Sequence, residues 1–229
     1  AGIHSLCSLL IAALAAWDVF GIWYAYPYRD LSGGRELFLL VVSVDVVCGP
    51  LLTLVLFNPL KPRKELILDL SLVAFIQLAA LGYGIWTVWE ARPLFLVHEL
   101  DRYKVISAPD IDVEKLKALP ESLQPRFWSG PQLVGIRPPK SAEESNTVLF
   151  EAAVGGRDYA ARPEFYIPYV GDVALRSVQR AKPLSAFLAR YPTQLAAAKD
   201  LAALKSEDMA AWLYVPVLGR QDWVAIVNK

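Results

Sequence analysis

Three runs of apolar residues constrain this chain more than any other feature of its sequence. They extend over residues 3–26, 37–57 and 66–89. A helix that crosses the hydrocarbon core of a bilayer needs about 20 predominantly apolar residues, and none of these runs is long enough to cross twice. We therefore expect three transmembrane helices in a membrane domain of residues 1–90.

Charge is distributed unevenly along the chain, which is 55% hydrophobic and 20% charged. Residues 1–90 contain five Lys or Arg and seven Asp or Glu, whereas residues 91–229 contain eighteen and sixteen. The second segment is long enough to bury a core of its own, and we expect it to fold outside the membrane. The formal net charge is zero, so the chain lacks the basic field that would attract nucleic acid.

The first apolar run must be distinguished from a secretory signal peptide. It exceeds the usual apolar length of a signal, contains Asp18, and ends in aromatic residues instead of a small-residue cleavage site. We expect a retained helix. The chain begins at Ala1 without Met or a basic flank, which we interpret as a processed start.

Basic residues between the second and third runs predict the topology. The loop of residues 58–65 contains two prolines together with Lys61, Arg63 and Lys64, whereas basic and acidic residues balance in the loop of residues 27–36. Cytoplasmic loops carry the excess of Lys and Arg. The prediction is a cytoplasmic N-terminus, a cytoplasmic loop at 58–65, and an extracytoplasmic domain of residues 91–229.

The extracytoplasmic segment has a mixed pattern that predicts an α+β domain. The expected strands are residues 94–100, 103–106, 165–170 at a sheet edge, and a hairpin of 212–218 with 223–227. The expected helices start after Asp110 or Asp112, after a Ser141–Glu144 capping box, at Pro183, and after Thr193. The Pro-rich residues 120–139 are expected to form a mobile loop.

Two acids within the apolar runs, Asp18 and Asp45, require an explanation. A charge at the centre of a membrane helix costs about 2.5 to 3.5 kcal/mol on insertion scales. Each acid lies about eight residues from the expected outer end of its helix, and thus about 12 Å deep at 1.5 Å per residue. We therefore expect both at the same level. Gly49 and Pro50 follow Asp45, and the proline predicts a kink with a free carbonyl at Val46.

Several interpretations of these acids remain open. In the first, Asp18, Asp45, Ser43 and Thr53 join the helices by hydrogen bonds worth about 0.6 to 2 kcal/mol each. In the second, the acids bind a polar group on a transmembrane helix of a partner, with Gly49 and Pro50 shaping the contact. Catalysis and ion movement are further readings, but the Gly-x-Gly-Asp signature of intramembrane aspartyl proteases is missing, and transporters normally have more helices.

The extracytoplasmic segment contains few residues suited to catalysis. Both cysteines, Cys7 and Cys48, fall in the apolar runs, and His98 is the one histidine after residue 90. We interpret His98 as a structural residue and expect no enzyme, cofactor or metal site. The charged residues around the first strand, Arg92, Asp101 and Arg102, are either a solvated cluster or a surface for recognition.

Several segments together resemble the type IV pilin accessory proteins of the TfpX/TfpZ kind. The strongest resemblance lies in residues 44–54 (VDVVCGPLLTL) and 57–66 (FNPLKPRKEL). It continues in residues 91–93 (ARP), 97–103 (VHELDRY) and 215–220 (VPVLGR). The first pair joins an intramembrane acid, a Gly-Pro kink and a Pro-rich basic loop.

The resemblance implies a bacterial inner-membrane protein that assists a cognate type IV pilin, major or minor, as a non-enzymatic accessory protein or chaperone. The implied domain after residue 90 is periplasmic, the bilayer is the second partner, and other pilus assembly proteins are further candidates. A pilin combines one long apolar helix with a globular head, so helices and outer domain could each contact it. The alternative is a membrane-anchored sensor or regulatory subunit whose periplasmic domain binds a ligand or protein.

Overall fold

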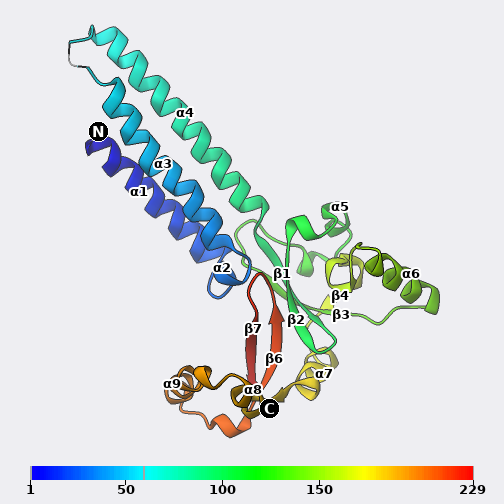
Figure 1. The fold of residues 1–229 in the computed structure, drawn as a ribbon. Helices are drawn as coiled ribbons and strands as arrows, with labels where there is room; N and C mark the ends of the chain where they lie inside the picture. The colour runs from blue at the N-terminus through cyan, green and yellow to red at the C-terminus, as the bar shows by residue number, and fades with distance from the viewer. Residues whose placement is uncertain (1, 59, 229) are drawn as a thin grey trace. The chain divides into compact units, whose positions relative to one another are not determined.

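A computed structural model describes residues 2–58 and 60–228 of the chain (Figure 1). The chain divides into two compact units. The helical unit consists of Ala1–Pro93 together with Phe127–Gly130, and the sheet unit consists of Leu94–Arg126 together with Pro131–Lys229. A short segment from the second half of the sequence therefore packs with the helices.

Long apolar helices build the helical unit. They are α1 (Gly2–Asp18), which continues as a π-helical segment over Val19–Trp23, α3 (Gly34–Leu56) and α4 (Arg63–Glu90), and a short α2 (Tyr28–Leu31) precedes α3. The three long segments have 22, 23 and 28 residues and are long and apolar enough to span a membrane. The three expected transmembrane helices are confirmed. The third begins at Arg63 instead of residue 66, directly after Pro62, because proline readily precedes or opens a first helical turn.

Both α1 and α4 pack against α3, as the ribbon shows (Figure 1). Near the α2 end of the bundle, Val19, Trp23, Tyr24, Phe38 and Val88 form its buried core. The Tyr24 hydroxyl donates a 2.9 Å hydrogen bond to the Val88 carbonyl. A Cβ on residue 34 would overlap the Tyr24 ring, so this closely packed helix start requires glycine.

Two contacts fix the register between α1 and α3. His4 Nδ1 lies 2.5 Å from Thr53 Oγ1 at one end, and the rings of Phe20 and Phe38 meet edge to face at 4.9 Å near the other. In this antiparallel register, Asp18 lies opposite residues 39–40 and Asp45 opposite residues 12–13.

The prediction that Asp18 and Asp45 share a level is therefore wrong. The first helical segment ends at Trp23, and α3 begins at Gly34. Asp18 is therefore five residues before the end of its segment, whereas Asp45 is eleven residues after the start of α3. At 1.5 Å per residue, the two acids are offset by about 9 Å along the bundle. The sequence estimate placed the end of the first helix too late and the start of the second too late, and both errors favoured equal depth.

The sheet unit is built on one mixed sheet of seven strands within residues 93–228. Its strands are β1 (Pro93–Glu99), β2 (Arg102–Ser107), β3 (Gln132–Ile136), β4 (Tyr166–Pro168), β5 (Lys182–Pro183), β6 (Trp212–Leu218) and β7 (Trp223–Asn228). The order is β4-β3-β1-β2-β6-β5, with β7 also paired to β6. The β1–β3 and β2–β6 pairs are parallel, whereas the β3–β4, β5–β6 and β6–β7 pairs are antiparallel.

Helices accompany this sheet, which confirms the expected α+β class. They are α5 (Val113–Leu116), α6 (Ala142–Ala153), α7 (Asp172–Arg180), α8 (Leu184–Arg190) and α9 (Leu195–Lys205). The main core lies against β1, β2 and β3, where Phe95, Val97 and Val134 are completely buried. A second cluster forms around Trp212, Leu184 and Ala198, where β6 meets α8 and α9.

Several local predictions are confirmed. The strands β1 and β2 and the β6–β7 hairpin form close to where short runs rich in β-forming residues placed them, and β4 lies at the sheet edge. Ser141 caps α6 by accepting a 3.1 Å hydrogen bond from the Glu144 amide. Asp112, not Asp110, caps α5.

Other local predictions are wrong. Residues 120–139 are not one mobile loop, because β3 lies within them and pairs with both β1 and β4. Thr193 does not cap α9, since a 3-10 turn at Pro192–Gln194 leads into the helix and its preceding residue is Gln194, without a side-chain cap. The helix α7, with the sequence DVALRSVQR, was not predicted.

Candidate functional site

A cavity of about 450 Å³ lies within the helical unit and is lined by α1, α3 and α4. Its walls are mostly apolar, but five polar side chains also line it, namely His4, Ser8, Asp45, Thr53 and Gln77. We call this cavity the membrane groove. Polar side chains in membrane-spanning helices are costly and commonly functional.

Asp45 and Gln77 form the polar contact between α3 and α4 in the membrane groove. The Gln77 amide Nε2 lies 3.2 Å from the Asp45 backbone carbonyl and 3.4 Å from its Oδ1. Gln77 is only 9% exposed, and its Oε1 has no hydrogen-bond partner among the residues that the structure describes. The side-chain carbonyl of Gln77 has no donor, and the Asp45 carboxylate has one long contact of 3.4 Å. These are therefore the polar groups that a further hydrogen-bond donor would satisfy.

Gly49 provides the space that Gln77 occupies. It is buried in α3 one turn after Asp45, and a Cβ at this position would overlap the Gln77 amide. Pro50 is inside the same helix and lacks the amide that would bond to the Val46 carbonyl. Of the four residues predicted for packing or partner binding, Asp45, Gly49 and Pro50 thus lie together in α3, at the groove or within one turn of it.

Asp18 lies elsewhere. Its side chain is exposed on the bundle, at the junction between α1 and the π-helical segment, and it does not line the membrane groove. The structure gives it no hydrogen bond or ion pair with any residue in 2–58 or 60–228. The two acids are therefore not brought together.

The predicted hydrogen-bond role of Ser43 and Thr53 is half correct. Thr53 reaches across to His4 of α1, so it joins two helices. Ser43 is exposed and donates to the Leu40 carbonyl of its own helix at 2.9 Å, a common alternative for serine within helices. Sequence reasoning missed His4 and Gln77, although Gln77 stands out as an uncharged polar residue in the third apolar run.

The basic residues near the other end of the bundle have different surroundings. Lys61 forms a 2.6 Å ion pair with Asp69 of α4, an acid in the third apolar run that sequence reasoning also missed. Arg63 and Lys64 are exposed in the first turn of α4. The signal for the Lys61–Asp69 pair was present in the sequence, because Asp69 is the one acid in residues 66–89 and follows the basic loop by about one turn.

Arg92 is not a surface residue, so its prediction as a recognition side chain is corrected. It is only 8% exposed, because its guanidinium lies 4.0 Å above the Trp89 ring and donates a 2.8 Å hydrogen bond to the Trp89 carbonyl. Asp101 and Arg102 are exposed beside the β1–β2 turn and pair with each other at 2.9 Å. This hydrogen bond lowers the pKa of Asp101, so the pair stays charged.

An aromatic cluster joins the segment Phe127–Gly130 to the helices. Trp23 Nε1 donates a 3.0 Å hydrogen bond to the Phe127 carbonyl, and the Phe127 ring lies 5.7 Å from the rings of both Trp23 and Trp89. Trp128 is 66% exposed next to Phe127. Tryptophan at the end of a membrane helix is typical of the interface between lipid and water.

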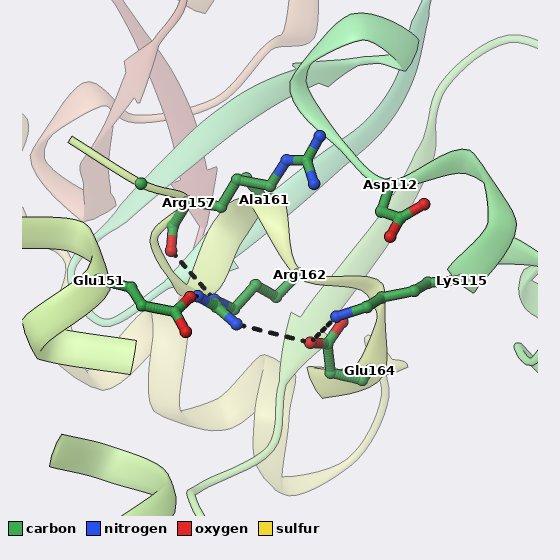
Figure 2. A pocket seen from close by; sticks show the side chains of 8 residues that line it. Asp112, Lys115, Glu151, Arg157, Ala161, Arg162 and Glu164 are labelled. Atoms are coloured by element: carbon green, nitrogen blue, oxygen red, sulfur yellow. Dashed lines mark hydrogen bonds and ion pairs between the residues drawn. The ribbon is translucent and has the colours of Figure 1, made fainter. Parts of the chain in front are cut away.

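The sheet unit also contains a charged cleft of about 360 Å³ (Figure 2). Figure 2 shows Arg162 between Glu151 and Glu164, with Glu164 also paired to Lys115 at 2.7 Å. Arg162 Nε further donates to the Arg157 carbonyl at 3.0 Å. These charges satisfy one another, which is typical of a network that holds α5, α6 and the intervening turns together.

Comparison with known proteins places these features in a family. The family model "Fimbrial assembly protein FimB" matches residues 1–33. The fimbrial assembly protein of serogroup I from Dichelobacter nodosus is 39% identical over the whole of this chain and 89% of its own length. The serogroup E1 protein of the same organism is 37% identical with the same coverage.

A third relative covers a shorter region. The fimbrial assembly protein of serogroups C1 and C2 from Dichelobacter nodosus is 48% identical over half of this chain and 88% of its own length. No solved structure matches the chain. The full-length identity agrees with the resemblance to pilin accessory proteins, and the chain belongs to the family of fimbrial assembly proteins.

Proposed function

We propose that this protein is a non-enzymatic chaperone of the bacterial inner membrane that holds the membrane helix of a cognate pilin until the pilin enters the pilus. The observation that carries the proposal is the membrane groove, a cavity of about 450 Å³ whose apolar walls surround Asp45 and Gln77. The names of the relatives support a role in assembly.

The composition of the groove suits a transmembrane helix better than a soluble ligand. Apolar residues at its rim, such as Leu78 at 61% and Ile11 at 38% exposure, offer surface for packing. Helices associate in lipid through close packing and interhelical hydrogen bonds, because lipid tails are as apolar as the side chains. A polar or cationic group on the entering helix would pair with Asp45, and this pairing would offset the cost of an acid at that depth.

The proposed orientation has a cytoplasmic N-terminus and a periplasmic sheet unit. Its support is the positive charge of Lys61, Arg63 and Lys64 at the α3–α4 connection. In this orientation, the aromatic cluster of Trp23, Trp89 and Phe127 lies at the periplasmic interface. The globular head of a membrane-held pilin would then be on the same side as the sheet unit.

The non-enzymatic part of the proposal is supported by how charged side chains are used. In the cleft of Figure 2, Arg162, Glu164 and Lys115 neutralise one another, so these charges are used in contacts within the protein. Elsewhere, Arg137 and Glu144 form a bidentate pair at 2.8 and 3.0 Å. Both side chains are thus held by strong hydrogen bonds within the protein.

The test is co-purification of the intact protein, extracted in a mild detergent, with the pilin of the same cell. We expect the pilin to accompany the wild-type protein and to be lost, at least in large part, from an Asp45→Asn variant. Asp18→Asn is the matched control, because it removes the same charge from an apolar run but outside the membrane groove; it should keep the pilin.

Two results would argue against the proposal. If a strain without this protein kept its normal pilin level and piliation, the chaperone role would be abandoned. If Asp45→Asn and Asp18→Asn retained pilin equally, the carboxylate in the groove would not be the group that holds the partner.

A further inference from the structure

The sheet unit contains a second cavity, of about 370 Å³, at the carboxyl ends of β1 and β3. These neighbouring strands are parallel, with His98 opposite Gly135, so both end at the same edge. In open sheets with parallel strands, ligands bind in the crevice outside the carboxyl ends of the strands. The volume lies within the range of about 300 to 1,000 Å³ that is usual for small-ligand pockets.

The cationic side of the cavity is provided by α7. Arg176 and Arg180 line the cavity from successive turns of this helix, and residues four apart share a helix face. Arg180 donates one hydrogen bond, a long one of 3.4 Å to the Leu100 carbonyl. Within residues 2–58 and 60–228, Arg176 has no hydrogen bond or ion pair, so both guanidinium groups have donors to offer.

The third arginine of the cavity is already occupied. Arg137 forms a bidentate ion pair with Glu144 and lies with its Cζ 4.2 Å above the Phe165 ring. It therefore shapes the wall without adding net charge. The uncompensated positive charge of the cavity belongs to Arg176 and Arg180, which argues against a cation or metal ion as the ligand.

Two further titratable groups line the cavity, and neither cancels this charge fully. Burial and the nearby Asp158 raise the pKa of Glu99, which favours its neutral form. Burial, together with Arg180 and Arg176, lowers the pKa of His98, so the imidazole is neutral near pH 7. His98 is 6% exposed, and its Nε2 has no hydrogen-bond partner in the described part of the chain; unsatisfied buried groups often mark a ligand or water position.

The remaining wall is apolar. Ile136, Pro138, Pro139 and Val173 line it, and the Tyr159 hydroxyl lies 3.4 Å from Ser145 Oγ at its margin. Arginine matches a carboxylate with parallel N–H donors, and an apolar wall suits a hydrocarbon body. We propose that this cavity binds a carboxylate carried on a small apolar body, with Arg176 and Arg180 holding the carboxylate. The proposal does not depend on the membrane groove or on the proposed function.

Two sources could supply this chemistry, namely a free carboxylic acid and the carboxyl end of a peptide. The test uses the full-length protein in neutral maltoside micelles, with backbone and arginine side-chain NMR signals as the readout. The probes are 4-methylpentanoate for the free acid and the tripeptide acetyl-Ala-Ala-Leu for the peptide end. Each probe is paired with its carboxamide, which keeps the body and removes the charge.

We expect saturable shifts at Arg176 and Arg180 with at least one carboxylate and not with its amide. Arg176→Gln and Arg180→Gln should each weaken binding about tenfold or more, as loss of a charge-assisted hydrogen bond predicts. Arg190→Gln is the matched control, because Arg190 is an exposed arginine in the last turn of α8 that does not line the cavity. All three arginines are exposed, so their substitution should leave the fold intact. Unchanged backbone amide spectra of the variants would verify this.

The choice between sources follows from which carboxylate binds more tightly. The proposal would be overturned if neither carboxylate shifted these signals, if acid and amide bound alike, or if the Arg176→Gln and Arg180→Gln variants bound as the Arg190→Gln variant does.

Discussion

Replacing Gly49 by alanine tests the packing of α3 against α4 in the membrane groove. Alanine in a helix interior is about 0.8 to 1 kcal/mol more favourable than glycine, so propensity alone predicts stabilisation. The new Cβ would, however, overlap the Gln77 amide, and the amide must move away from Asp45. That movement breaks the contacts of 3.2 and 3.4 Å to the Asp45 carbonyl and carboxylate.

The magnitude follows from these opposing effects. Interhelical hydrogen bonds in membranes average about 0.6 kcal/mol each, so two cost about 1.2 kcal/mol. An off-rotamer Gln77 adds about 0.5 to 1.5 kcal/mol. We therefore expect Gly49→Ala to destabilise the protein by about 0.7 to 1.9 kcal/mol in the wild-type background, after the propensity gain is subtracted. In a Gln77→Ala background, the overlap is gone and the propensity gain should appear, which gives a coupling energy of about 1.7 to 2.7 kcal/mol.

The assay is equilibrium unfolding by SDS in mixed micelles, applied to both single variants and the double variant. Gly82→Ala is the matched control, because Gly82 lies inside α4 and a Cβ there meets nothing within 4 Å; it should be stabilising in either background. If Gly49→Ala stabilised the protein as much as Gly82→Ala does, with or without Gln77, the inferred close packing at Gly49 would be refuted.

Three other measurements test separate parts of the structure. Because Val134 lies in β3 between two strands, its amide should exchange with solvent as slowly as that of Val97 in β1; rapid exchange would restore the mobile-loop interpretation. Hydrogen bonds from Arg137 and the Lys140 amide depress the pKa of Glu144 to about 2 from its ordinary 4.5, so its contribution to stability is present above pH 4.5 and is lost as the pH falls through about 2. The Glu144→Gln variant should not show this loss of stability at low pH. If its unfolding had the same pH dependence as that of the wild type, the stabilising role of the Arg137–Glu144 ion pair would be contradicted. A periplasm-dependent reporter fused after the last residue should be active, and one inserted after residue 60 inactive, whereas the opposite pattern would reverse the proposed topology.

Patterns that depend on burial alone were predictable from the sequence. A membrane helix must be apolar over its whole length, so the three runs could be recognised without knowledge of their neighbours. The β6–β7 hairpin was equally accessible, since two short runs rich in β-forming residues flank the turn signal at Gly219 and Asp222. These features are local, because each depends on the apolar character of its own residues and not on contacts with distant parts of the chain.

Features set by distant contacts were not predictable in this way. The strand β3 consists of only five residues between prolines, and its register is set by pairing with β1 and β4. The relative depth of Asp18 and Asp45 depends on where each helix ends, which is the least certain part of a sequence-based assignment. An error of a few residues at two ends was enough to turn an offset into apparent alignment.

The candidate site shows the same division. Asp45, Gly49 and Pro50 could be singled out because an acid and a Gly-Pro pair are unusual in a membrane helix. Gln77 could not be assigned to them, because its position beside Gly49 follows from the packing of α4 on α3. Asp18 met the same sequence criterion as Asp45, but the structure leaves it outside the membrane groove.

Site-specific photocrosslinking within cells tests whether the membrane groove holds the helix of a pilin. A photoreactive residue at Leu78, which lines the groove, is compared with one at Ile76, which is on the same helix at nearly the same depth but does not line it. Both positions are exposed, at 61% and 52%. If the groove holds pilin, position 78 should crosslink to the membrane helix of pilin and position 76 should give little or no crosslink. Equal crosslinking from both positions, or none from position 78, would contradict it.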